Sequence, residues 1–271
     1  MNEGHNEPRS LDLDDYLARI GYAGDLGPTR KVLEGLHLAH SLHIPFENLD
    51  VLLGRPIKLD LESIQGKLVK SRRGGYCFEQ NALFAAVLQR VGFAVTLLAA
   101  RVRNGATRLL PRTHMLLKVE AEGTSWIADV GFGSEGLLLP IPLKPDEVNR
   151  QFHWSYRLRR EGERWALQGI RQGAWMDIYV FSLEPQYPVD YEVANYYVST
   201  HPDSRFTQTL AVQLATRDTW YLLRNYDFIV KRADGETVRT IESDEELLRV
   251  LKETFGLQFP DGTRFPFKTV L

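Results

Sequence analysis

Cysteine is almost absent from this sequence: Cys77 is the only one in 271 residues. A single thiol cannot form an internal disulfide framework, so nothing points to secretion or to an oxidising compartment. Long apolar runs are missing as well, since none approaches the roughly 18 residues of a membrane-spanning helix. The start, MNEGHNEPRSLDLDDYL, lacks the basic residues and apolar core of a signal peptide, so we expect a cytoplasmic location.

An excess of one charge sign is also missing. Lys and Arg total 33 against 35 Asp and Glu, a formal net charge of −2, and the two signs are interspersed. Electrostatic binding of nucleic acid needs a basic stripe, so we expect no nucleic-acid partner, and because no long apolar run is present we expect no membrane partner. The sequence has no internal repeat and no low-complexity tract, which excludes solenoids and propellers. Its 44% hydrophobic and 25% charged residues are typical of a globular protein.

The spacing of apolar residues divides the chain into three zones, which we expect to be domains: 1–91, 92–188 and 189–271. In the first zone apolar residues recur every three or four positions, with Asp, Thr or Ser near the start of each run, and this pattern predicts helices. The last of these helices begins near Cys77, and Gly92 is placed to end it. The others are expected at 11–21, 29–43 and 61–71.

The second zone changes to the two-residue period of β-strands. Short β-rich runs alternate with Gly or charged turns, which is typical of an antiparallel sheet or a small barrel. The segment 137–147, LLLPIPLKPDE, contains three prolines and is predicted to be a surface connection. The predicted strand segments are 93–102, 113–123, 125–133, 154–169 and 175–183.

The third zone mixes both periods. A helix is expected near 190–198, and a last helix opens at Ser243, which has capping-box spacing to Glu246. Strands are expected between these helices, at 209–216, 220–232 and 237–241. The order along the chain is therefore helices, then sheet, then a mixed end.

Cys77 can be interpreted as a packing residue or as a nucleophile. A free cysteine is most often a small buried hydrophobe. Here Gly74 and Gly75 let the backbone turn sharply and approach a ligand, and the first turn of a helix offers unpaired N–H groups that favour a thiolate. Arg72 and Arg73 add positive charge nearby. These surroundings favour a nucleophile over a packing residue.

Among the seven histidines, His114 has a carboxylate that strand pairing can bring close. The segments HMLLKVE and SWIADVG read as two strands of a hairpin joined through AEG. With the first two residues of AEG as the loop, His114 lies directly opposite Asp129, with Cβ atoms about 4.5–5.5 Å apart. With the last two as the loop, the pair is diagonal, at about 7–8 Å. A three-residue loop would put the two on opposite faces. In both two-residue registers the other face collects apolar residues: Met115, Leu117, Val119, Trp126 and Ala128.

Three more histidines form HLAHSLH and raise the alternative of a metal site. Steps of three residues rotate each ring by about 60° around a helix, and no cysteine or carboxylate joins them at a metal-binding spacing. We therefore interpret His37, His40 and His43 as a polar helix face and expect no metal.

Two further motifs lie near these candidates. GFGSEG, from Gly131 to Gly136, matches a dinucleotide fingerprint, but no helix opens after it, so we interpret it as a wall of the site beside Asp129. IPFENLDVL carries Glu47 and Asn48, which favours a turn whose polar groups are satisfied locally. Glu47 could also pair with Arg73 in structural support of the site.

Four segments in this order, IPFENLDVL, RRGGYCFEQN, RTHMLLKV and WIADVGFG, resemble the arylamine N-acetyltransferases, and NYYVSTHPDSRF resembles that family's third region. The resemblance implies an α+β fold with an N-terminal helical bundle, an antiparallel β-barrel and a C-terminal α/β lid around a transglutaminase-like cysteine-enzyme core. It implies a catalytic triad with substrate-binding residues near the donor or acceptor. The triad is Cys77, His114 and Asp129, and the neighbours are Thr113, Phe132 and Gly133.

The resemblance also implies a reaction. Acetyl-CoA would be the cosubstrate, with no metal or tightly bound cofactor, and a small aromatic amine or hydrazine would take the acetyl group from an acetyl-cysteine, as in xenobiotic metabolism. A cysteine hydrolase, either thioesterase or protease, would use the same triad and is the alternative. A non-catalytic interaction protein on the same fold is a further one. The preferred amine, the second oxyanion donor and the oligomeric state stay open.

Overall fold

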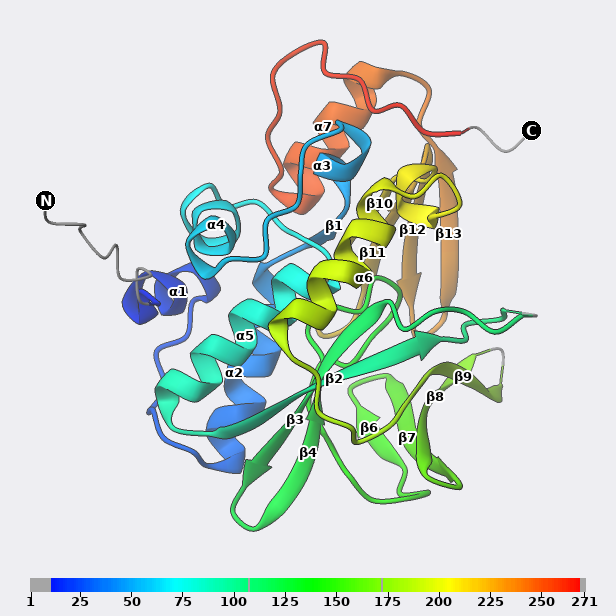
Figure 1. Ribbon diagram of the computed structural model, residues 1–271. Helices are drawn as coiled ribbons and strands as arrows, with labels where there is room; N and C mark the ends of the chain where they lie inside the picture. Colours follow the sequence, from blue (N-terminus) through cyan, green and yellow to red (C-terminus); the bar gives the residue numbers. More distant parts are fainter. Residues whose placement is uncertain (1–10, 107, 172, 269–271) are drawn as a thin grey trace, which may run out of the picture.

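Two antiparallel sheets and a layer of helices make up the fold in the computed structural model, which describes residues 11–106, 108–171 and 173–268 (Figure 1). Among these residues no helix is long and apolar enough to span a lipid bilayer. The predicted α+β class is confirmed, with helices first, a barrel in the middle and a second sheet with helices at the end.

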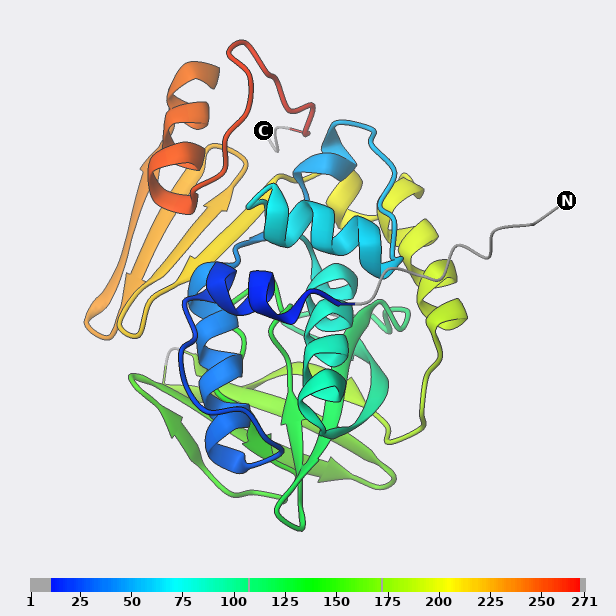
Figure 2. The same ribbon diagram turned by 90° about the vertical axis from the view of Figure 1, so that its left-hand side faces the viewer.

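The predicted N-terminal helices form where capping residues start and stop them. The Asp12 side chain accepts from the Asp15 N–H at the start of the first helix, and Thr29 does the same for Val32 at the start of the second. Gly92, with φ of 107°, ends the cysteine helix. Figure 2 shows α2 and α5 side by side against the larger sheet. The elements are α1 (Leu13–Ile20), α2 (Arg30–His43), α3 (Leu49–Leu52), α4 (Leu61–Gln65), the π-helical turn η1 (Gly66–Lys70) and α5 (Cys77–Val91).

The middle of the chain folds into an eight-stranded antiparallel sheet, in the order β5-β4-β3-β2-β9-β8-β7-β6. The sheet curls into a nearly closed barrel around an apolar core that contains Leu116 and Ile127, while Leu117 and Ala128 face the helices. The alternation along β3 and β4 therefore separates two cores. The strands are β2 (Ala94–Val102), β3 (His114–Ala121), β4 (Thr124–Ala128), β5 (Ile141–Pro142), β6 (Asn149–Gln151), β7 (Trp154–Glu161), β8 (Arg164–Arg171) and β9 (Ala174–Phe181).

The hairpin between β3 and β4 has the second of the two expected registers. Ala121 pairs with Thr124, so the loop is Glu122 and Gly123, whose φ values of 51° and 74° suit the tight turn of a two-residue hairpin. His114 and Asp129 are consequently diagonal neighbours on one face. The predicted apolar set lies on the other face, in the core beneath the helices: Met115, Leu117, Val119, Trp126 and Ala128.

The second sheet pairs one short strand from the N-terminal part of the chain with four strands from the C-terminal part. Its order is β1-β10-β11-β12-β13, and Leu247 and Leu251 of the last helix pack against Val212 and Leu223 on one of its faces. The elements are β1 (Phe46–Glu47), α6 (Pro188–Thr200), the 3₁₀ turn η2 (Arg205–Thr207), β10 (Ala211–Ala215), β11 (Trp220–Arg224), β12 (Asp227–Arg232), β13 (Gly235–Thr240) and α7 (Asp244–Phe255).

Two connections differ from their sequence interpretation. The proline-rich segment 137–147 is no surface connection at its start, because Leu137, Leu138 and Ile141 are buried and Ile141–Pro142 forms β5. Asn48 is not satisfied locally: its side-chain amide donates to the carbonyls of Phe206 and Thr209. A single polar side chain thus ties the start of α3 to the second sheet.

The interpretation of HLAHSLH as a polar helix face is wrong for two of its three rings, since His37 and His40 are fully buried. His40 Nε2 lies 2.6 Å from Gln80 Oε1, and His40 Nδ1 lies 2.8 Å from the Tyr16 hydroxyl. The Gln80 amide nitrogen donates to two carbonyls, so its oxygen must face His40. Nε2 therefore carries a proton, and burial, which lowers the pKa of His40, keeps Nδ1 unprotonated so that it accepts from the Tyr16 hydroxyl.

Because His37 and His40 are buried as neutral rings, we expect the protein to lose stability as the pH falls. Burial lowers the pKa of His37 to about 4 and that of His40 to about 3. Because histidine in an unfolded chain titrates near 6.5, the unfolded state binds protons first, and each ring lowers the free energy of unfolding by up to about 1.4 kcal/mol per pH unit below about pH 6.5.

His40→Gln should remove one of these contributions. The variant is expected to be less stable at pH 7, with a gap to the wild type that narrows as the pH falls to 5. Urea unfolding of both proteins across this range measures the gap, and a gap that does not change with pH would contradict neutral burial of His40.

Candidate functional site

Cys77 lies in the first turn of its helix, as predicted: it is the first residue of α5, and the residue is 4% exposed. The N–H of Tyr76, just before the helix, donates to Glu79 Oε2 at 3.0 Å. As the first helical residue, Cys77 has no intrahelical acceptor for its own N–H, which is left for a group outside the helix.

The two glycines before Cys77 leave room for protein, not for a ligand. A Cβ on Gly74 would lie 2.1 Å from the Pro45 carbonyl oxygen, and one on Gly75 would lie 2.6 Å from Glu79 Oε2. Neither glycine has a positive φ, so no left-handed turn requires them. Their role is to let the chain before α5 pack against the segment that leads into β1.

The positive charge expected beside Cys77 is already paired. Arg73 Nη2 lies 2.6 Å from Glu47 Oε1, an ion pair in which Glu47 is fully buried and Arg73 partly buried, while Arg72 is exposed. Lys67 Nζ lies 2.8 Å from Glu79 Oε1 at the start of α5. Burial nevertheless raises the pKa of Glu79 to about 7 against the effect of Lys67. These ion pairs bind α5 to η1 and the segment before α5 to β1, and they leave the helix N-terminus and His114 as the groups that face the thiol.

His114 and Asp129 form a buried hydrogen-bonded pair, with Nε2 2.7 Å from Oδ2 and with exposures of 3% and 1%. The second carboxylate oxygen, Oδ1, accepts from Asn81 Nδ2 and from the Gly131 N–H, each at 3.0 Å. Every oxygen of this buried carboxylate thus has a donor, as a buried charge requires.

Burial by itself would lower the pKa of His114, but the charge and hydrogen bond of Asp129, together with Cys77, raise it to about 10. In return, the His114 charge keeps the pKa of Asp129 below its usual value in spite of burial. Because Nε2 faces Asp129, Nδ1 is the ring nitrogen left for Cys77. The Cys77 Sγ also lies 3.6 Å from the carbonyl oxygen of Thr113, the residue before His114. The structure therefore brings the cysteine, the imidazole and the carboxylate together.

A cleft of about 560 Å³ opens beside this group. Thr113, Phe132 and Gly133 all line it, and the Phe132 ring also contacts His114, with centroids 5.1 Å apart. The absent side chain of Gly133 is filled by protein, since a Cβ there would lie 2.4 Å from the Phe46 ring. The remaining walls come from 102–106 and 108–111, from α6 and η2, and from β10 and β11.

Sequence reasoning missed Asn81. Its Nδ2 donates to the Met115 carbonyl at 2.8 Å as well as to Asp129, and its Oδ1 accepts from the Val130 N–H at 3.1 Å. The available signal was its position four residues after Cys77, on the same face of one helix. Within the described ranges no group of three His, Cys, Asp or Glu side chains is arranged to hold a metal ion.

The chain has relatives of known name and structure. A family model described as N-acetyltransferase matches residues 29–263. The arylamine N-acetyltransferase of Escherichia coli (strain K12) is 43% identical over 254 residues, which cover 92% of this chain and 90% of the relative. The crystal structure of Nocardia farcinica arylamine N-acetyltransferase is similar with a TM-score of 0.87 at 44% identity, covering 92% of this chain and 90% of that one. Mycobacterium marinum arylamine N-acetyltransferase in complex with CoA has a TM-score of 0.86 at 35% identity, covering 90% and 92%.

Asn81→Ala should destabilise the protein by about 2–4 kcal/mol, because it leaves the Val130 N–H and the Met115 carbonyl without partners in a buried site. Asn149→Ala is the control: it removes one exposed hydrogen bond and should cost less than about 0.5 kcal/mol. Urea unfolding measures both, and equal losses would mean that Asn81 does not hold the buried network.

Proposed function

Since the chain belongs to the arylamine N-acetyltransferase family, we propose that it moves an acetyl group from acetyl-CoA to the nitrogen of an aromatic amine or hydrazine through an acetyl-Cys77 intermediate. Membership of the family assigns acetyl transfer to the enzyme. The observation that supports the route through cysteine is the buried pair of His114 and Asp129 beside the thiol at the start of α5.

In the first step the Cys77 thiolate attacks the thioester carbonyl of acetyl-CoA. The bond between the acetyl carbon and the CoA sulfur breaks, and the departing sulfur takes a proton from the His114 imidazolium. The Cys77 N–H, which has no acceptor within the helix, donates to the oxyanion that forms on the way. A pKa of about 10 means that His114 holds this proton at neutral pH.

In the second step the amine nitrogen attacks the acetyl carbon and His114, now neutral, takes a proton from that nitrogen. The bond to Sγ breaks, and Cys77 leaves as the thiolate paired with the imidazolium. Such proton transfer by a positioned base contributes about 10²–10⁴-fold in rate. Asp129 stabilises the imidazolium and holds the ring so that Nδ1 faces the sulfur.

The cleft fits a phosphate-bearing donor and a flat acceptor. Arg108, Arg205 and Arg224 line it, and burial together with the charge of Arg224 lowers the pKa of Arg205, so the positive charges of Arg205 and Arg224 are crowded together. Anionic phosphates of acetyl-CoA would relieve that crowding. Phe132 and Phe206 offer aromatic faces to an arylamine ring. These features favour acetyl transfer over hydrolysis of a peptide by the same three groups.

Brief mixing with acetyl-CoA and no amine is expected to leave one acetyl group on the Cys77 peptide, and Cys77→Ser should leave none. Mass spectrometry of the digested protein measures both. In initial-rate experiments, parallel double-reciprocal lines for acetyl-CoA at several amine concentrations are expected. An active enzyme with unmodified Cys77 and intersecting lines would contradict the intermediate.

Asp129→Asn should lower kcat on the order of 10³-fold. Asn81 and Gly131 both donate to Oδ1, so the new amide would keep its oxygen there and turn its NH₂ toward His114 Nε2. The His114 proton would then sit on Nδ1, toward Cys77, and the ring could not act as the base. Asp14→Asn, at an exposed site in α1, is the matched control. Comparable kcat for Asp129→Asn and the control would rule out the proposed role of Asp129.

A further inference from the structure

His37 lies on α2, outside the catalytic group, yet it hydrogen-bonds to the backbone of Asp129. The Asp129 N–H donates to His37 Nε2 at 3.1 Å, and His37 Nδ1 lies 3.0 Å from the Leu138 carbonyl oxygen. The ring is fully buried and makes a T-shaped contact with the Phe84 ring. One side chain therefore joins two backbone segments that are nine positions apart.

The partners fix the protonation state of His37. A backbone N–H can only donate and a carbonyl can only accept, so Nε2 offers its lone pair to Asp129 and Nδ1 carries the proton toward Leu138. A protonated ring would turn an N–H against the Asp129 N–H. The surroundings agree, since burial lowers the pKa of His37 even with the Asp129 carboxylate nearby. His37 is neutral and cannot supply the charge or the proton of the reaction.

The bond to Asp129 occurs where strand pairing stops. The last pair of the β3–β4 ladder is Leu117 with Ala128, so the N–H of Asp129 has no partner on β3. Side chains accept the next three backbone N–H groups in place of a strand. His37 accepts from Asp129, Asn81 accepts from Val130, and the Asp129 carboxylate accepts from Gly131.

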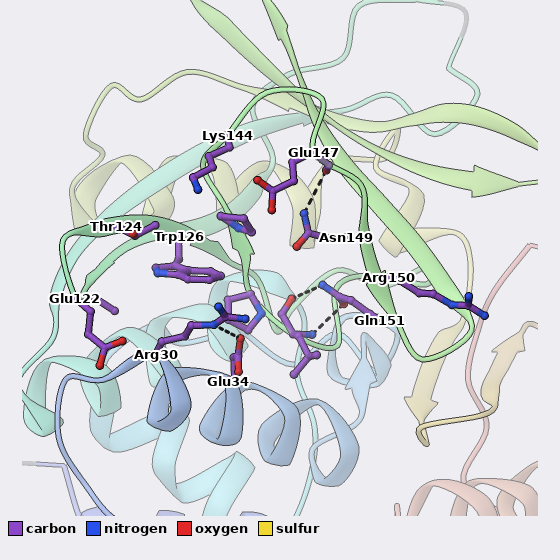
Figure 3. Close-up of a pocket in the computed structure, with 14 residues that line it drawn as sticks. Arg30, Glu34, Glu122, Thr124, Trp126, Lys144, Glu147, Asn149, Arg150 and Gln151 are labelled. Atoms are coloured by element: carbon purple, nitrogen blue, oxygen red, sulfur yellow. Dashed lines mark hydrogen bonds and ion pairs between the residues drawn. The ribbon is translucent and has the colours of Figure 1, made fainter.

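The other end is equally fixed. Gln151 Oε1 accepts from the N–H groups of Leu138 and Leu139, and Gln151 Nε2 donates to the Leu139 carbonyl. Figure 3 shows Gln151, with its two hydrogen bonds to Leu139, at one side of a cavity of about 370 Å³ that shares no lining residue with the 560 Å³ cleft. Leu138 is thus held through its N–H by Gln151 and through its carbonyl by His37.

We propose that His37 is a positioning residue for acetyl transfer: as a neutral imidazole it clamps both ends of the loop 130–137 and so sets the Asp129 carboxylate against His114. The inference rests on the proposed function, because it assigns a task in that reaction. The clamped loop carries Phe132 and Gly133, so the same ring also fixes one wall of the cleft.

Three variants separate the two bonds of His37. His37→Gln can still reach the Asp129 N–H with its amide oxygen but loses Leu138, whereas His37→Asn can donate to Leu138 but loses Asp129. His37→Phe keeps the ring and loses both. The expected order of Cys77 acetylation rates is wild type, then Gln, then Asn, then Phe, with a loss of about 10–100-fold for Phe because misplacement of about 1 Å is that costly.

His40→Gln is the matched control, since His40 is equally buried on the same helix and its partners, Tyr16 and Gln80, do not touch Asp129. His40→Gln should melt at a lower temperature than the wild type and acetylate Cys77 at the wild-type rate. A second readout is alkylation of Cys77 by iodoacetamide against pH. An Asp129 carboxylate that is held less firmly stabilises the His114 imidazolium less, and the imidazolium in turn stabilises the Cys77 thiolate. The midpoint of the alkylation rate against pH should therefore move to higher pH in His37→Asn and His37→Phe and stay unchanged in His40→Gln.

Wild-type alkylation profiles in all folded His37 variants would overturn the clamp, as would equal acetylation by His37→Gln and His37→Asn. Alkylation needs no acetyl-CoA, so it tests the clamp even if wild-type Cys77 stays unacetylated. An unacetylated wild-type Cys77 would count against the proposed function instead. If His37→Phe fails to fold, the order of the Gln and Asn variants decides.

Discussion

The whole arrangement depends on holding one carboxylate charged in a place that water cannot reach. Asp129 is 1% exposed, and its two oxygens and its N–H are all hydrogen-bonded by protein groups. A buried carboxylate without such partners would be neutralised or would destabilise the fold by several kcal/mol. With them, it keeps a protonated imidazole beside Cys77, which is the requirement of the proposed chemistry.

That requirement explains why the helices and the barrel must meet where they do. Asn81 on α5, His37 on α2 and His114 on β3 converge on Asp129 from three elements. The hydrophobic core beneath α2 and α5 sets the distance between them and the strands, so packing determines the geometry of the polar group. The barrel interior then closes over the other face of His114 through Phe132 and Tyr179.

The local elements of the fold, meaning the helices, the strands and the hairpin, could be predicted from the sequence. Helix and strand periods predicted most of the elements, and the two-residue hairpin placed His114 and Asp129 on one face, because a register is fixed by a short turn and an alternating pattern. The sequence was insufficient where a polar residue finds its partner far along the chain. His37 was interpreted as part of a polar surface and Asn48 as locally satisfied, yet their partners lie 92 and more residues away. Burial of a polar side chain depends on tertiary packing, which no short pattern encodes.

If Asp129 keeps His114 protonated beside Cys77, nitrogen NMR of ring-labelled histidine will detect that proton. The His114 signal is assigned by its loss in His114→Gln and followed from neutral to alkaline pH. We expect an imidazolium, with both ring nitrogens protonated, that persists at neutral pH and titrates near its pKa of about 10. A neutral His114 ring at pH 7.5 in the resting enzyme would contradict it.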